Sequence, residues 1–246
     1  MAVMNEIKTL RLGPTNCYFL KCESGYLLID TSLPEYFQAF LERLKTINVD
    51  LPEIKYLLLS HSHDDHAGFA AEVRERTKCK IIAHENAVES LKAGTILNVG
   101  QFLNRQARVL MSLYNWAKRR TFEYSPVTLR DDDFIVSGDD DKILKTIGVD
   151  GKIVYTPGHT NDLISVIMAK GDAFVSDSCM SNLGFLHYRP IEVSNLNSVF
   201  DSWQKIIENG AQNIYPGHGK PFSVKELIRY KEKYAPARTL ANQPLN

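Results

Sequence analysis

Short apolar runs alternate with amphipathic segments along the amino-terminal part of the chain. Strands are predicted at 17–22, 26–30, 54–59 and 80–83, and helices at 34–47 and 67–77. In the first helix, Phe37, Phe40 and Leu44 recur at helical spacing, and Pro34 suits the start of a helix. Strands that alternate with helices in this way predict a sheet covered by helices.

The alternation changes between about 94 and 134, where apolar residues follow a long helix-like spacing. Further strand-like pieces follow at 143–147, 152–155, 163–169 and 173–176, and helices are predicted at 199–208 and 224–234. We interpret the chain as one mixed α/β domain over 1–246, with a helical insertion at about 94–130.

Composition limits the classes of partner. The chain has 246 residues, and its 29 basic residues balance its 29 acidic ones, so the net charge is zero. A neutral chain lacks the basic excess that favours nucleic acids or anionic membranes, so neither is an expected partner. Its apolar runs are shorter than the ~20 residues of a membrane span.

Cysteine usage and the start of the chain bear on the compartment. The four cysteines form no CxxC pair and are interpreted as reduced thiols. Residues 1–8 lack the long apolar region of a signal peptide. We therefore expect a cytoplasmic protein.

Metal-binding residue types are concentrated just after the apolar run 54–59. The segment Ser-His-Ser-His-Asp-Asp-His-Ala-Gly at 60–68 contains His61, His63, Asp65 and His66. Imidazole is the commonest metal ligand and carboxylates also bind zinc. We expect these side chains on a loop at a strand's end. The alternative is a histidine-rich surface turn.

Three further residues argue against a surface turn. His159 and His218 each follow a short β-type segment and a Pro-Gly turn, and Asp177 directly follows the apolar run 173–176. The number, type and context of these residues together predict a metal site.

The whole pattern resembles the metallo-β-lactamase superfamily of metal-dependent hydrolases. The motif His-x-His-x-Asp-His is complete at 61–66, and His159, Asp177 and His218 follow in the family's order. The segments 16–20 and 27–31 resemble the family's opening hairpin, although Ser32 stands where glycine is usual, and Ser176 precedes Asp177 where glycine is also usual. The resemblance implies a four-layer αββα sandwich of the α/β (α+β) class, with the site between two sheets.

The resemblance also implies the ligand set and the mechanism. His61, His63 and His159 would hold a first metal, Asp65, His66 and His218 a second, and Asp177 would bridge them. Two divalent ions would share a bridging hydroxide as the nucleophile, and Asp65 would be the catalytic residue that orients it. Zinc suits this nitrogen and oxygen set, and iron or manganese are alternatives.

The sequence leaves several interpretations for the residues that contact the substrate. The insertion at 94–130 is either a lid whose Phe102, Tyr114 and Trp116 line a pocket, a helix packed on the body, or a dimer contact. His187 and Tyr188, with Trp116, are the candidate substrate-binding residues.

For several other polar residues we expect a structural or solvent-exposed position and no direct part in the chemistry. We interpret the basic run 118–120 as a solvated helix end. Asp64, which fills a variable slot of the motif, is expected to be exposed or to support the ligands. His84 is expected at the surface or at the start of a helix.

These features favour a dinuclear hydrolase of a small-molecule ester, thioester or lactone. A phosphodiesterase or nuclease could use the same site but needs a basic groove. A β-lactamase is disfavoured because those enzymes usually lack a carboxylate at the position of Asp177. Flavodiiron oxidoreductases carry an acidic residue where this chain has His63. A homodimer remains an alternative to a monomer.

Overall fold

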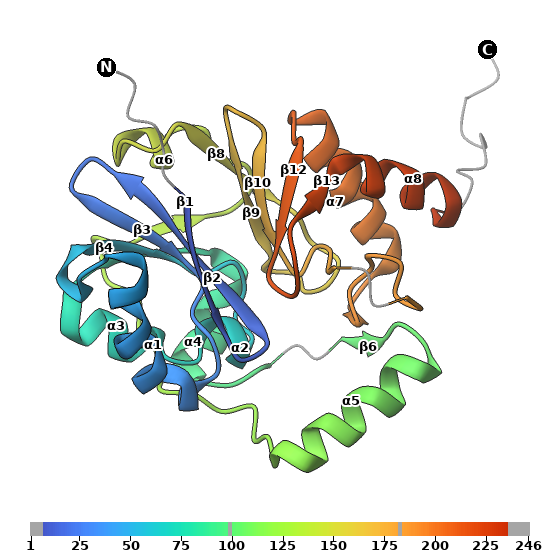
Figure 1. Ribbon diagram of the computed structural model, residues 1–246, viewed down its shortest axis with the longest axis horizontal. Helices are drawn as coiled ribbons and strands as arrows, with labels where there is room; N and C mark the ends of the chain where they lie inside the picture. The colour runs from blue at the N-terminus through green and yellow to red at the C-terminus, as the bar shows by residue number, and fades with distance from the viewer. Residues whose placement is uncertain (1–6, 98–99, 182–183, 236–246) are drawn as a thin grey trace.

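Two β-sheets lie face to face in the computed structural model, which describes residues 7–97, 100–181 and 184–235 (Figure 1). The first sheet has the strand order β1 (Ile7–Leu12), β2 (Thr15–Cys22), β3 (Gly25–Ile29), β4 (Ile54–Leu58), β5 (Lys80–His84), β7 (Phe134–Val136). The second has the order β13 (Phe222–Ser223), β12 (Asn213–Pro216), β10 (Asp172–Ser176), β9 (Ile164–Met168), β8 (Gly151–Tyr155). A small ladder pairs β6 (Gln101–Phe102) with β11 (Glu192–Val193).

Helices cover the outer faces of the sheets (Figure 1). The α-helices are α1 (Phe37–Leu44), α2 (Asp64–Ala67), α3 (Ala70–Thr77), α4 (Val88–Ala93), α5 (Arg105–Lys118), α6 (Ile143–Thr146), α7 (Leu196–Glu208) and α8 (Val224–Tyr234). Short 3-10 turns are η1 (Pro34–Tyr36), η2 (Lys45–Ile47), η3 (Leu51–Glu53) and η4 (Glu85–Ala87). No helix in the described ranges is long and apolar enough to cross a bilayer.

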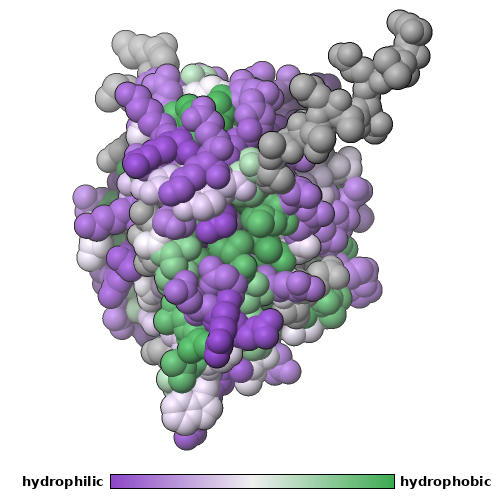
Figure 2. Space-filling view, turned by 90° about the vertical axis from the view of Figure 1, so that its right-hand side faces the viewer, coloured by the Kyte–Doolittle hydropathy of each residue, from purple (hydrophilic) through white to green (hydrophobic). Residues whose placement is uncertain are grey.

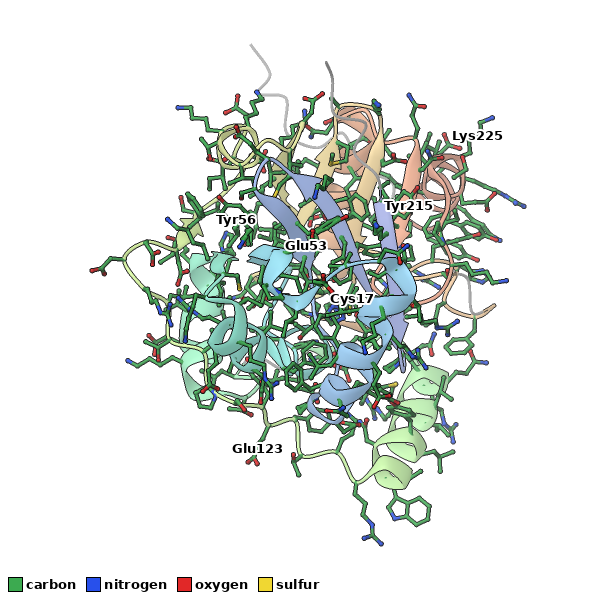
Figure 3. The ribbon with its side chains drawn as sticks, turned by 60° about the vertical axis from the view of Figure 1, so that its left-hand side comes forward. Cys17, Glu53, Tyr56, Glu123, Tyr215 and Lys225 are labelled. Atoms are coloured by element: carbon green, nitrogen blue, oxygen red, sulfur yellow. The ribbon has the colours of Figure 1, made fainter. Side chains whose placement is uncertain are left out.

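The alternation of side chains along β2 shows why the first sheet is buried on both faces. Cys17 and Phe19 pack in the core beneath α1 and α3, whereas Tyr18 and Leu20 point into the core between the sheets. Figure 3 shows Cys17 in the interior, whereas the side chain of Glu123 points outward. A strand buried on both faces is a continuous apolar run in the sequence, as 17–20 is here.

The second sheet repeats this arrangement on its own outer side. Ile153 and Val166 join the core between the sheets, whereas Val154 and Ile167 pack with Trp203 of α7 in an outer core. Three apolar layers between four layers of secondary structure make the αββα sandwich, so the expected fold is confirmed.

One prediction of secondary structure was wrong, and another holds only in part. Residues 143–146 form the helix α6 instead of a strand, because the carboxylate of Asp140 accepts hydrogen bonds from the backbone N–H groups of Lys142 and Ile143 and starts a helical turn. The insertion at about 94–130 is helical only in part. It contains β6 and α5, and α5 ends where Arg119 adopts φ 49°.

Strand direction places the candidate site. β3, β4 and β5 are parallel to one another, and β10 is parallel to β12 in the other sheet. The carboxyl ends of β4, β10 and β12 lead into the segments that carry His61, Asp177 and His218. An isolated bridge between Thr15 and His218 joins the two sheets at this edge.

Candidate metal centre

The histidine motif begins as a loop and ends as a helical turn. His61 lies three residues beyond the end of β4, and extended His63 precedes α2. The carbonyl of His63 accepts hydrogen bonds from the backbone N–H groups of His66 and Ala67. Asp65 and His66 therefore lie on a short helix, and not on the loop predicted for the whole motif. The turn brings side chains that are close in sequence to one side of the cluster.

All seven predicted ligands come together. The potential ligand atoms of His61, His63 and His159 lie within 4.8 Å of one another, and so do those of Asp65, His66 and His218. These two groups are the two sets that the resemblance implied. The site therefore contains His and Asp groups that could bind metal ions.

Asp177 lies between the two groups. Its Oδ1 is 3.5 Å from Nε2 of His66, and its Oδ2 is 3.7 Å from Nε2 of His159 and 3.3 Å from Nε2 of His218. One carboxylate thus reaches a member of each group, as a shared ligand must.

Unpaired polar atoms show that the cluster fits a cation. Nε2 of His61 and Oδ1 of Asp177 are buried and have no hydrogen-bond partner among the described residues. An unpartnered buried acceptor is costly, and a bound cation would remove that cost. The donor set of imidazoles and carboxylates is the one that zinc and other first-row divalent metals accept.

The far nitrogens of three histidines are held in place. Nδ1 of His66 donates to Asp30 at 2.9 Å, Nδ1 of His159 to the carbonyl of Glu192 at 2.8 Å, and Nδ1 of His218 to the carbonyl of Pro14 at 2.9 Å. These bonds fix the tautomer that leaves each Nε2 free for a metal.

Asp30 supports the cluster through the hydrogen bonds of its buried carboxylate. Its carboxylate accepts hydrogen bonds from the backbone N–H and the hydroxyl of Ser60, both at 2.7 Å, and from the hydroxyl of Ser176 at 3.0 Å. Sequence reasoning noted Asp30 only as part of the opening hairpin. Its position at the end of a buried strand was the available signal for this role.

Electrostatics divide the cluster into neutral and charged members. Burial lowers the pKa of His63 to about 3 and holds that of His61 well below its usual value. Burial also opposes charge on His66, but Asp177 and Asp30 outweigh it and raise the pKa of His66 to about 9. The pKa of Asp177 is lowered, because His218 and His66 outweigh its burial.

Gly217 allows the close approach of two ligands. A Cβ atom at this position would lie 2.6 Å from Oδ1 of Asp177 and 2.7 Å from Cε1 of His66. Both distances are shorter than carbon contacts allow, so a side chain here would displace the ligands.

A pocket of about 350 Å³ opens onto the cluster. His63, Asp65, His159, Asp177 and His218 form its floor. Its apolar walls are formed by Ile96, Leu110, Met111, Tyr114, Phe122, Met180 and Ile191. α5 supplies part of this wall, so the insertion lines a pocket, as one of its three interpretations required.

Only one of the three aromatic residues expected to line the pocket does so. Tyr114 lies on its wall, but Trp116 is 80% exposed and lies outside the lining. Trp116 is two positions beyond Tyr114, a rotation of about 200° around the helix axis, so its side chain lies on the outer side of α5. Phe102 packs instead with Ala107 and Met180 in a small neighbouring core.

His187 and Tyr188, the other candidate substrate residues, also lie outside the pocket lining. The ring of His187 stacks on Tyr230 and Tyr234 of α8, with centroids 5.3 Å and 5.0 Å away. Tyr188 packs on Phe222 at 4.4 Å. Aromatic packing on β13 and α8 holds both rings away from the metal cluster.

The role expected of Arg120 was wrong, whereas Asp64 takes one of its two expected roles. Arg120 is not a solvated helix end, because its guanidinium forms a buried ion pair with Asp64 and lines the pocket. Asp64 is buried and supports the motif, which was one of its two expected roles. His84 is buried, and its Nδ1 accepts from the N–H of Asn86 at a helix start.

Comparison with known proteins agrees with this geometry. The sequence profile of the Metallo-beta-lactamase superfamily matches residues 10–176. A "Beta-lactamase-like protein 2 homolog" of Caenorhabditis elegans is 25% identical over 230 residues, 90% of this chain and 63% of that protein. A "Lactamase-like protein" of Pestalotiopsis microspora is 22% identical over 212 residues, 85% of this chain and 50% of that protein. The chain thus spans less than two thirds of either relative.

Solved structures share the fold. BJP-1, a subclass B3 metallo-beta-lactamase of Bradyrhizobium japonicum, superposes with a TM-score of 0.65 at 19% identity, covering 95% of this chain and 89% of that one. ST1585, an archaeal superfamily protein from Sulfolobus tokodaii, gives a TM-score of 0.60 at 16% identity, covering 98% and 91%. The two-sheet sandwich, the cluster at its edge and the matched profile lead to one conclusion: the chain belongs to the metallo-β-lactamase superfamily, whose members are generally metal-dependent hydrolases.

Proposed function

We propose that this protein is a dinuclear metal hydrolase that cleaves a small ester, thioester or lactone. The observation that carries the proposal is the convergence of seven imidazole and carboxylate side chains, five of which form the floor of a pocket with apolar walls. Both parts of the observation are needed for the proposal. The candidate ligands indicate the type of reaction, and the apolar walls indicate the class of substrate.

The two ligand groups would each hold one divalent cation, most consistently zinc. His61, His63 and His159 form the first set, and Asp65, His66 and His218 form the second. Asp177 contacts both sets and would be the shared ligand. When bound, the cations would act as Lewis acids and lower the pKa of a shared water toward about 7.

Asp65 is the residue proposed to act directly in catalysis. One carboxylate oxygen lies 3.4 Å from Nε2 of His218, and the side chain also lines the pocket. The pKa of Asp65 stays well below its usual value, because His66 and His218 outweigh the effect of burial. An ionised carboxylate in this place can accept a hydrogen bond from the attacking water and orient it toward the substrate.

The walls of the pocket favour an acyl substrate over a phosphodiester. Leu110, Met111 and Phe122 present apolar surface above the ligands. Among the described residues, two cations belong to the pocket lining: Arg120, which is already paired with Asp64, and Arg11. An apolar acyl group gains from burial against such walls, whereas a phosphodiester would be favoured by more free positive charge than Arg11 alone supplies.

The test compares metal-stripped protein with protein reloaded with zinc, on a thioester, an ester, a lactone, a phosphodiester and a lactam. We expect zinc-dependent turnover of at least one of the first three. Asp65→Asn should reduce that turnover by a factor of about 100 or more, whereas the exposed-site control Asp131→Asn should leave it unchanged. Turnover of the phosphodiester or the lactam alone would overturn the substrate class.

A further inference from the structure

The outer side of α5 carries large apolar side chains that the fold leaves uncovered. Val109 is 51% exposed, Leu113 60% and Trp116 80%. They are four and seven positions apart along the helix, so they share one face. Figure 1 shows α5 outside the two sheet layers, and in Figure 2 hydrophobic and hydrophilic surface alternate in the lower part of the molecule, where this helix lies.

The same helix is strongly basic. The segment 105–118 contains no acidic residue, and it carries Arg105, Arg108 and Lys118, followed directly by Arg119. The next residue, Arg120, is paired with Asp64 and adds no free charge. Arg105 and Arg108 are exposed and have no ion-pair partner among the described residues. The zero net charge of the chain therefore conceals a local excess of positive charge beside an apolar stripe.

We propose that α5 docks this protein on an anionic lipid bilayer surface. A helix with exposed aromatic and aliphatic side chains flanked by arginines lies in the plane of a bilayer, with its apolar face among the acyl chains and its cations beside the phosphates. A second copy of the chain fits less well, because two such helices would place like charges against each other. Over 14 residues α5 is about 21 Å long, enough to present the whole stripe at once.

The inner side of the helix holds it ready for this contact. Ala107 is fully buried against Met180 and Leu186, and Asn104 caps the helix by accepting from the N–H of Ala107 at 2.8 Å. The helix is thus formed and oriented in the lipid-free protein, so docking does not require α5 to fold on the bilayer surface. This proposal concerns binding alone and stands independently of the reaction proposed above.

The experiment is co-sedimentation of the full chain with vesicles of equimolar phosphatidylcholine and phosphatidylglycerol, compared with vesicles of phosphatidylcholine alone. We expect binding to the anionic vesicles that is at least about tenfold stronger and that weakens with added salt. Trp116 supplies a second measurement: its emission should shift to shorter wavelength on binding. The other tryptophan, Trp203, is already fully buried.

Paired variants distinguish binding through α5 from non-specific adsorption of the protein to vesicles. Leu113→Asp and Arg108→Glu should each reduce vesicle binding about tenfold. The controls Ile135→Asp and Lys145→Glu make the same changes at exposed sites away from α5 and should bind as the unaltered chain does. Absence of binding to anionic vesicles, or α5 variants that bind normally, would overturn the proposal. So would a dimer in solution that Leu113→Asp dissociates, because a second copy would then cover the stripe.

Discussion

The guanidinium of Arg120 donates a hydrogen bond to the carboxylate of Asp64, the residue between His63 and Asp65 in the metal motif. Both side chains are largely buried, with exposed fractions of 9% and 4%. The pair joins the segment after α5 to the helical turn that presents Asp65 and His66. The position of the pocket wall and the position of the ligands are therefore linked by one ion pair.

Removal of Arg120 should destabilise the fold more than loss of an ordinary charge. In Arg120→Gln the carboxylate of Asp64 would remain buried without its cation, at a cost of about 3 kcal/mol in the free energy of unfolding. The double variant Asp64→Asn with Arg120→Gln should lose less than the sum of the two single changes. Urea unfolding of all four proteins measures this coupling.

A surface pair supplies the control for this cycle. Lys80 and Asp132 lie 3.6 Å apart with exposed fractions of 43% and 59%. Lys80→Gln should change the free energy of unfolding by less than about 1 kcal/mol. Equal losses at the two pairs would contradict the buried, linking role of Arg120.

Gly217→Ala should damage the metal site without unfolding the protein. The new methyl group would meet Asp177 and His66 at distances that force both ligands to move. We expect a loss of zinc content of about half or more after dialysis, because metal affinity depends on how precisely the ligands are held in place. Elemental analysis measures the content, and circular dichroism reports the fold.

Gly138→Ala is the matched change, since a Cβ there meets no atom within 4 Å. It should retain the zinc content of the unaltered chain. A full zinc complement in Gly217→Ala would show that the ligands tolerate displacement, contrary to the tight packing described above.

The stability of the metal-free protein should fall as pH rises above the ordinary pKa of histidine. The pKa of His66 is raised from 6.5 to about 9, so the charged form is favoured in the folded state. That contribution is complete below pH 6.5 and is lost as pH rises through 9. Asp30→Asn removes one of the three carboxylates, Asp177, Asp30 and Asp65, that raise this pKa, so the loss of stability at alkaline pH should become smaller. Urea unfolding between these pH values measures it.

His63 gives the opposite dependence and so serves as an internal comparison. Its pKa is lowered from 6.5 to about 3, so the neutral form is favoured and its contribution is lost as pH falls below 6.5. The metal-free protein should therefore be most stable near pH 6.5, because the contribution of His63 is lost below this pH and that of His66 above it. A stability that rises steadily from acid to alkali would show that His66 is not charged in the folded state.

Sequence was sufficient to predict which candidate ligands cluster, but not their surroundings. The seven candidate ligands could be named because their types, their order and their places beside apolar strands match the family resemblance, as at His61 after β4. Arg120 could not, because its partner Asp64 is distant in sequence and only the fold shows that the pair is buried. His187 was misplaced for a related reason: its stacking partners on α8 follow it by more than forty residues.

Asp177 gives the sharpest test of whether one carboxylate serves two cations. Because it contacts His159 of the first group and His218 of the second, Asp177→Ala should lower zinc content at both positions. His63→Ala removes a ligand of the first group alone and should lower zinc content by about one ion of the two. The measurement is zinc per chain by elemental analysis after gel filtration. If Asp177→Ala kept as much zinc as His63→Ala, Asp177 would belong to a single site, and the chemistry proposed for a shared water would lose its structural basis.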